Sequence, residues 1–254
     1  MRSSAASDVY KRQTPLFTAK DSSSTAQPIT TQPVVVLHPT ERHSNTSPNT
    51  MLFFGTGQFV TENDVTLTSG NTFYGIWDTG SAISSARGVA LVEQTITADT
   101  LGGFDVRLMS NNPVSYSTHR GWFVDLPDTG ERVISRPIAL GSIVVYNTIV
   151  PSDNLCSTSG GYSWTMVHNL IDGSEPDFVA FDVTGDGDFD SSDQIDGKNV
   201  TGKKSDDFQW QIRMVGAGGN EYIGIIPEAD ITTEGFQDEP SVGQRSSWGR
   251  YEMD

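Results

Sequence analysis

The 254-residue sequence has little cysteine, histidine or positive charge. Its single cysteine, Cys156, excludes a disulfide within the chain, so cysteine usage does not assign a redox compartment. The four histidines lie at positions 38, 43, 119 and 168, without the spacing of a zinc or catalytic cluster. Only 16 basic residues accompany 32 acidic ones, and the formal charge of −16 argues against nucleic acid and anionic membrane as partners.

Long hydrophobic runs and catalytic motifs are also missing. The longest apolar runs, such as 34–37 and 51–54, fall far short of the ~18 residues that a membrane-spanning helix needs. The sequence contains no Gly-x-Ser-x-Gly elbow, no His-Glu-x-x-His pair and no glycine-rich phosphate loop before a helix. We therefore expect neither a membrane span nor an enzyme.

The most informative feature that is present is an acidic stretch at 182–193, Asp-Val-Thr-Gly-Asp-Gly-Asp-Phe-Asp-Ser-Ser-Asp. In EF-hand-like calcium loops, oxygen ligands come from positions 1, 3, 5, 7, 9 and 12, and glycine at position 6 permits a sharp turn. Gly187 stands at position 6 here. The ligand positions hold Asp182, Thr184, Asp186, Asp188, Asp190 and Asp193.

The spacing predicts a Ca²⁺ site with these six residues as ligands. Position 7 normally uses its backbone carbonyl and position 9 often acts through water, so the side chains of Asp182, Asp186 and Asp193 matter most. Thr184 departs from the usual aspartate or asparagine. So many carboxylates in one turn repel one another unless a cation neutralises them, although a solvated acidic turn is the alternative. The following Gln-Ile-Asp-Gly does not resemble a second EF-hand helix, so we expect an isolated loop between strands.

Periodicity predicts an all-β fold of short strands separated by turns of glycine, proline, asparagine and aspartate. This pattern is typical of a sandwich, barrel or propeller, and no tidy internal repeat is visible. Residues 14–32 are rich in serine, threonine, glutamine and proline and are predicted to be a loop or linker. The predicted strands are 33–38, 51–60, 72–78, 89–97, 104–109, 120–126, 131–139, 142–150, 162–170, 178–182, 208–215 and 221–226.

The start of the chain differs in character from the rest. Asp-Val-Tyr-Lys-Arg-Gln at 8–13 resembles the translation of an adaptor used in sequencing libraries, and 1–7 has no signal-peptide character. We expect 1–13 not to be native sequence, and the remainder to be a fragment of a longer protein.

Several motifs follow one another in a fixed order between about residues 30 and 250. They are Met-Leu-Phe-Phe-Gly-Thr-Gly-Gln-Phe-Val at 51–60, Phe-Tyr-Gly-Ile-Trp-Asp at 73–78, Arg-Gly-Trp-Phe-Val-Asp-Leu at 120–126, Gly-Glu-Arg-Val-Ile-Ser-Arg-Pro at 130–137, Thr-Ile-Val-Pro-Ser at 148–152, Cys156, Gly160, Gly161, Trp164 and Arg-Ser-Ser-Trp at 245–248. In this order they resemble the carboxy-terminal domain of PilY-type proteins, the tip-associated adhesins of bacterial type IV pili.

The resemblance implies a modified, partial β-propeller over 33–250, with irregular blades and long loops. It also implies an exported protein at the pilus tip, outside the outer membrane of a Gram-negative bacterium. The implied role is calcium-dependent control of pilus extension and retraction, adhesion and twitching motility, with the acidic residues of the loop as the carried-over site. Minor pilins or a tip complex are the implied partners, together with a host or surface ligand. Gly249 departs from the basic residue usual after Trp248.

Two rival functions remain open at this point. One is a calcium-stabilised extracellular domain that binds carbohydrate or accompanies a hydrolase, with tryptophans lining a sugar site. The other is an aspartic-protease-like enzyme, because Ile-Trp-Asp-Thr-Gly-Ser at 76–81 contains Asp78 in that signature and a second Asp-Thr-Gly begins at Asp128. The second copy is more typical of a hairpin turn, and nearby Glu131 and Arg132 are expected to act as cross-strand ion partners.

Overall fold

A computed structural model describes residues 14–41, 48–83, 87–152 and 160–206, and the backbone of 211–217 and 220–226. Within these residues strands dominate, and the helical elements are two 3₁₀ turns, η1 (Glu62–Thr66) and η2 (Ser191–Asp193). No helix in this part of the chain is long and apolar enough to cross a membrane. The all-β prediction is confirmed.

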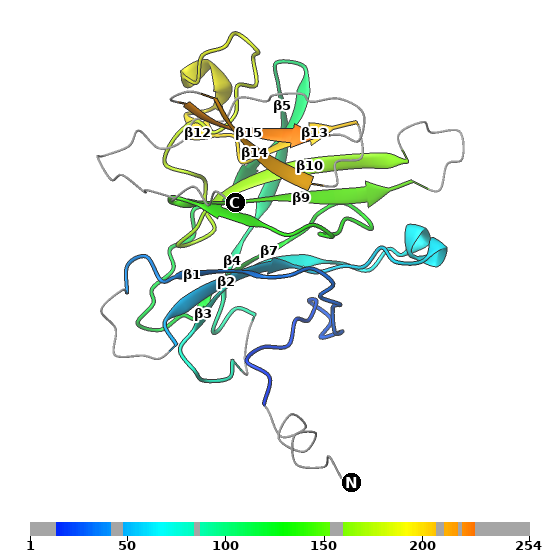
Figure 1. Ribbon diagram of the computed structural model, residues 1–254, viewed down its shortest axis with the longest axis vertical. Coiled ribbons are helices and arrows are strands. Elements are labelled where there is room, and N and C mark those ends of the chain that lie inside the picture. The colour runs from blue at the N-terminus through cyan, green and yellow to red at the C-terminus, as the bar shows by residue number, and fades with distance from the viewer. Residues whose placement is uncertain are drawn as a thin grey trace, which may run out of the picture.

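Two large sheets form the body of the molecule (Figure 1). The first has the order β1 (Val34–Leu37), β2 (Thr50–Gly55), β3 (Thr72–Asp78), β7 (Gly121–Asp125) and β4 (Val92–Gln94). The second has the order β5 (Ile96–Leu101), β6 (Phe104–Met109), β13 (Gly202–Ser205), β10 (Gly161–Asn169), β9 (Ile143–Pro151) and β8 (Ile138–Leu140). All neighbouring strands are antiparallel except β4 and β7. The sheets do not close into a ring, which fits a partial propeller.

Two small sheets accompany the large ones. β11 (Gln194–Ile195) pairs with β12 (Lys198–Asn199) directly after the acidic loop, and β14 (Gln211–Ala217) pairs with β15 (Asn220–Ile226). The chain passes from the first large sheet to the second between β4 and β5, where only Thr95 separates the two strands.

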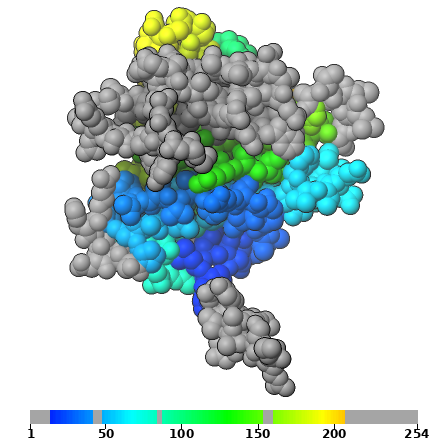
Figure 2. Space-filling model, viewed as in Figure 1, coloured from blue at the N-terminus to red at the C-terminus, as the bar shows by residue number. Residues whose placement is uncertain are grey.

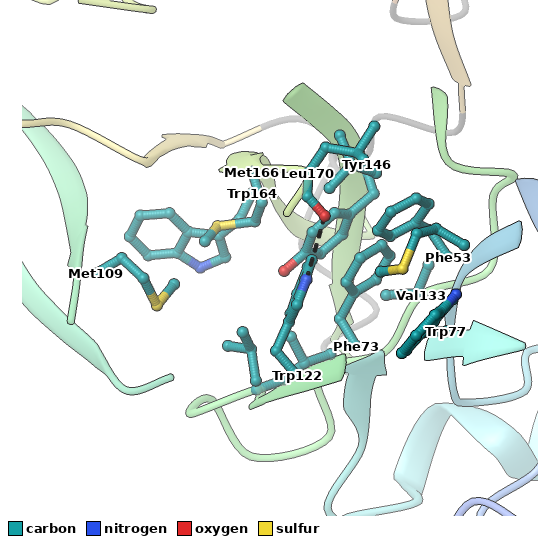
Figure 3. Packing of buried hydrophobic residues seen from close by; sticks show 14 residues of the cluster. Phe53, Phe73, Trp77, Met109, Trp122, Val133, Tyr146, Trp164, Met166 and Leu170 are labelled. Carbon is teal, nitrogen blue, oxygen red and sulfur yellow. Dashed lines mark hydrogen bonds between the residues drawn. The ribbon is translucent and has the colours of Figure 1, made fainter. Parts of the chain in front are cut away.

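The main hydrophobic core lies between the large sheets. Successive side chains of a strand point to opposite faces, so Val144 and Tyr146 of β9 join this core while Ile143 and Val145 face away from it. Tyr146 stacks on Phe73 of the first sheet, with ring centroids 3.6 Å apart (Figure 3). β9 is therefore buried on both faces, against the first sheet on one side and against a second cluster that includes Ala180 and Phe181 on the other.

The outer faces of the sheets are covered by irregular chain. Phe17 and Ala19, within the segment 14–32, pack on Phe54 and Tyr74 of the first sheet. The segment itself has only isolated β-bridges, Lys20 with Ala26 and Ile29 with Gly57. Figure 2 shows it in blue against the first sheet, with the acidic loop in yellow at the opposite end of the molecule.

Most predicted strands are present within a few residues of their expected bounds. The prediction of a strand at 178–182 is wrong, because this segment has no ladder partner and instead packs Ala180 and Phe181 on the outer face of the second sheet. The prediction at 131–139 is also largely wrong. Only an isolated bridge from Arg132 to Ile149 and the start of β8 are found there, and Pro137 lacks the N–H that a continuous ladder would use.

A buried ion pair lies at the edge of the main core. Glu131 accepts two hydrogen bonds from Arg107, at 2.7 and 2.8 Å, and both side chains are almost fully buried. Arg107 also contacts Asp128 at 3.0 Å and lies 3.8 Å from the ring centroid of Trp164. Glu131 is thus an ion partner between elements, as expected, whereas Arg132 donates to backbone carbonyls of Gln58, Asp64, Leu67 and Gly130.

Candidate metal centre

The acidic loop 182–193 follows the apolar segment on the second sheet and ends in η2. Gly185 and Gly187 turn it, with φ of +75° and +89°. A Cβ at Gly187 would meet nothing within 4 Å, so the backbone angle, not space, favours glycine there. The residue at position 6 therefore makes the kind of turn that a calcium loop requires.

The first and last aspartates of the loop bind its backbone. Asp182 accepts hydrogen bonds from the N–H groups of Gly185, at 2.6 Å, and Gly187, at 3.0 Å. Asp193 is fully buried, and its Oδ1 accepts from Val183 N, Thr184 N and the Thr184 hydroxyl at 2.7, 2.9 and 3.1 Å. The end of the loop is thereby tied to its beginning.

The remaining ligand candidates are exposed. Asp186 accepts from the Asp188 N–H at 2.9 Å, and Asp190 accepts from the Ser192 N–H at 2.7 Å. The Ser192 bond holds the pKa of Asp190 below its ordinary value, because an N–H donor stabilises the charged carboxylate. The carboxylate of Asp188 is also exposed, and the backbone carbonyl is the ligand expected at this position.

Apolar side chains on both sides of the loop anchor it to the second sheet. Phe181, Val183 and Val200 are buried in one cluster with Val106 and Val167. The two ends of the loop are therefore anchored, while its middle, in yellow, lies at one end of the molecule (Figures 1 and 2). The side chains of Asp186 and Asp188 in this part are exposed.

The chemistry of the loop suits a hard cation, because every ligand candidate offers oxygen. Asp182 and Asp193 are already held by backbone donors, and Asp186 and Asp188 are exposed. In the part of the chain that the structure describes, no three histidine, cysteine, aspartate or glutamate side chains lie close enough together to hold one ion. The turn fits a calcium loop, and binding would require the exposed carboxylates to move inward.

Glu175 was not predicted as part of this region. Its carboxylate accepts from the Asn199 N–H at 2.8 Å and from Asn111 Nδ2 at 2.6 Å. Asn199 belongs to the hairpin β11–β12 that follows the loop, whereas Asn111 is 64 positions away from Glu175. No local sequence pattern marks such a contact.

The two Asp-Thr-Gly turns do not form a protease dyad. Asp78 ends β3 and binds the N–H of Gly80 in its own turn, whereas Asp128 follows β7 and contacts Arg107. In the register of these antiparallel strands Thr72 faces Asp125 and Ile76 faces Gly121, so Asp78 and Asp128 lie beyond opposite ends of the pair. The paired stretch alone is roughly 13 Å long at about 3.3 Å per residue. The two carboxylates cannot share a proton at that separation.

The tryptophans in the described chain belong to the core. Trp77, Trp122 and Trp164 are between 0% and 7% exposed and lie in the cluster between the sheets. They therefore provide no open sugar-binding face, while Trp210 and Trp248 fall outside the described residues, as does Cys156.

Related proteins with this combination of fold and motifs are known. A family model described as the PilY1 β-propeller domain matches residues 2–106. The chain is 34% identical over 165 residues to a type IV pilus biogenesis factor PilY1 homolog of Xylella fastidiosa, covering 63% of this chain and 11% of the relative. It is 29% identical over 221 residues to type IV pilus biogenesis factor PilY1 of Pseudomonas aeruginosa strain UCBPP-PA14, covering 76% of this chain and 18% of that protein.

A solved structure shares the fold. The crystal structure of the Pseudomonas aeruginosa PilY1 C-terminal domain matches with a TM-score of 0.70 and 28% identity, over 87% of this chain and 47% of that one. The chain therefore spans less than a fifth of these curated relatives and about half of the solved domain. The family match begins at residue 2, although 1–13 lies outside the described residues.

Proposed function

The chain belongs to the PilY1 family of type IV pilus biogenesis factors, and we propose that it acts as a calcium-binding surface domain of a pilus tip or biogenesis protein. In this proposal it contributes to control of pilus extension and retraction, to adhesion and to twitching motility. The likeness in sequence and structure, which extends over most of the chain, is the observation that carries the pilus assignment.

The acidic loop supplies the calcium ligands in this proposal. Asp182, Asp186 and Asp193 would contribute side-chain oxygens, Asp188 its backbone carbonyl, Asp190 a water-mediated contact and Thr184 its hydroxyl. Calcium would add two positive charges to a loop that carries five aspartates. The chain's own contribution is the glycine turn and the backbone bonds that already fix both ends of the loop.

The proposed location is the cell surface at the pilus tip, on the exterior of a Gram-negative outer membrane. The proposed partners are minor pilins or another tip complex, with a host or surface molecule as a further ligand. The strongly acidic composition supports an aqueous surface and argues against nucleic acid as a partner.

Replacement of the matching region in Pseudomonas aeruginosa PilY1 by residues 14–254 would test the assignment. We expect the chimera to restore surface pili and twitching in a strain that lacks its own PilY1. A matched chimera carrying Asp186→Ala should still be exported, but its twitching should respond differently to calcium in the medium. An exported, stable chimera that supports no pili would contradict the pilus role. Equal calcium responses of the two chimeras would contradict only the calcium role.

A further inference from the structure

The loop 170–176, here called the connecting loop, lies between β10 and the acidic segment. Hydrogen bonds hold it to the first sheet and to the chain just before β7. Three side chains from that side donate to its successive carbonyl groups: Trp122 to Leu170, Tyr116 to Ile171 and Gln94 to Asp172. The bond from Trp122 is the dashed line in Figure 3. Gly173 lies so close to Trp122 that a Cβ there would be 2.4 Å from the indole ring. The connecting loop is therefore fixed where it leaves β10.

Gln94 also organises the place where the chain crosses between the sheets. This side chain is 1% exposed, and its Oε1 accepts from the Ser110 hydroxyl at 2.7 Å and the Asn112 N–H at 3.0 Å. Its Nε2 donates to the Asn112 carbonyl at 2.7 Å. These bonds join the end of β4 to the end of β6. This place, here called the sheet junction, consists of residues 94–95 and 110–112.

Glu175 connects this junction to the acidic loop. One carboxylate oxygen accepts from Asn111 in the junction, and the other accepts from the N–H of Asn199 in the hairpin β11–β12. The side chain of Asn199 accepts from Gln194 Nε2 at 2.7 Å, and Gln194 directly follows Asp193. Hydrogen bonds therefore link Gln194, the residue next to position 12 of the loop, through Asn199 and Glu175 to Asn111 in the sheet junction.

We infer that Glu175 is a positioning residue that couples the acidic loop to the sheet junction. A change in the loop on ion binding then alters the packing of the two large sheets at Gln94. The inference rests on the calcium binding proposed above. Its physical basis is that one carboxylate has partners on two elements far apart in the sequence, so a shift of the hairpin strains or releases the bond between Glu175 and Asn111.

Amide hydrogen exchange of the 254-residue chain, with and without calcium, tests the coupling. Ser110 N–H donates to Thr95 and Asn112 N–H donates to Gln94, so both amides report on the junction. We expect calcium to slow their exchange by about fivefold or more in the wild type, the lower end of typical coupling between sites. Glu175→Ala should abolish this slowing and, because coupling is reciprocal, should weaken calcium binding by the same factor.

Asp177→Ala is the matched control, since it removes an exposed carboxylate two positions away. It should bind calcium and show slowed exchange at the junction as the wild type does. A purely structural role for Glu175 would instead speed exchange equally with and without calcium, and that result would overturn the inference. Calcium binding by the wild type without slowing at 110 and 112 would also overturn it. A wild type that binds no calcium in a calorimetric titration would refute the calcium proposal as well.

Discussion

Among the residues of the acidic loop, Asp193 has a role that does not depend on an ion. It is fully buried and satisfies two backbone N–H groups and one hydroxyl. Asp193→Ala leaves the buried N–H of Val183 without its acceptor, which costs about 1–3 kcal/mol for an unsatisfied group. We expect that loss in the free energy of unfolding, measured by urea denaturation in the presence of a chelator.

Asp188→Ala is the control for this effect, because its side chain is exposed and only its backbone N–H bonds within the loop. Its unfolding free energy in chelator should lie within about 0.5 kcal/mol of the wild type. Equal losses for the two variants would show that Asp193 has no special structural role.

His168 makes stability depend on pH. Burial lowers the pKa of His168 from its ordinary value of 6.5 to about 3 in the folded protein, where its ring bonds to Tyr146 and Gly173. Between these values the unfolded chain binds a proton that the folded chain does not, so stability is lost as pH falls below 6.5. We expect a loss of about 1.4 kcal/mol per pH unit between pH 6 and 5 from this residue.

Urea unfolding of the wild type and His168→Gln at pH 6.5 and 5 measures this contribution. The variant should be less stable at pH 6.5 but should lose less stability on acidification. His119→Gln, at a partly exposed position, serves as the control and should keep the wild-type pH dependence. If the unfolding free energy of His168→Gln falls with pH as steeply as that of the wild type, His168 is not the source of the pH dependence.

At the scale of elements, alternating side chains were sufficient to predict most strands but not the chain that covers them. Strands such as β3 and β6 match their predicted bounds because their side chains alternate between two buried layers. Residues 178–182 have the same apolar character, yet they pack on a sheet without joining one. An apolar composition indicates that a segment is buried. A place in a β-sheet also requires a neighbouring strand whose backbone N–H and C=O groups are available for pairing.

The pairing of Arg107 in β6 with Glu131 joins an element of the second sheet to the turn after β7. Both charges are buried, so removal of Glu131 leaves the Arg107 guanidinium with only the partly exposed Asp128 as an ion partner. Glu131→Gln should therefore destabilise the protein by about 3–5 kcal/mol. The double variant Arg107→Met, Glu131→Leu should lose less than the sum of its single changes, which a double-mutant cycle by urea unfolding would detect. If the losses of the two single variants simply add in the double variant, the Arg107–Glu131 ion pair is not the main source of the destabilisation.

At the scale of the whole molecule, the sequence predicted the fold and the position of the acidic loop better than the connections around it. The loop ligands lie within twelve consecutive positions, so their spacing is visible. Glu175 meets Asn111 across 64 positions and Asn199 across 24, and ordinary polar residues so far apart have no recognisable pattern. Such contacts arise only when the second sheet brings three separate segments together.

The acidic loop shares its base with the hydrophobic cluster of the second sheet, so an ion bound there should stabilise more than the loop. Phe181, Val183 and Val200 connect the two regions. At a calcium concentration 100 times the Kd, selective binding to the folded state adds about 2.7 kcal/mol. We expect a higher Tm in calcium than in chelator, with a smaller rise in magnesium.

Asp186→Ala should abolish most of the rise in Tm without changing the Tm in chelator, because that side chain is exposed. An unchanged Tm in saturating calcium would refute binding to the folded loop, leaving its aspartates as a solvated turn.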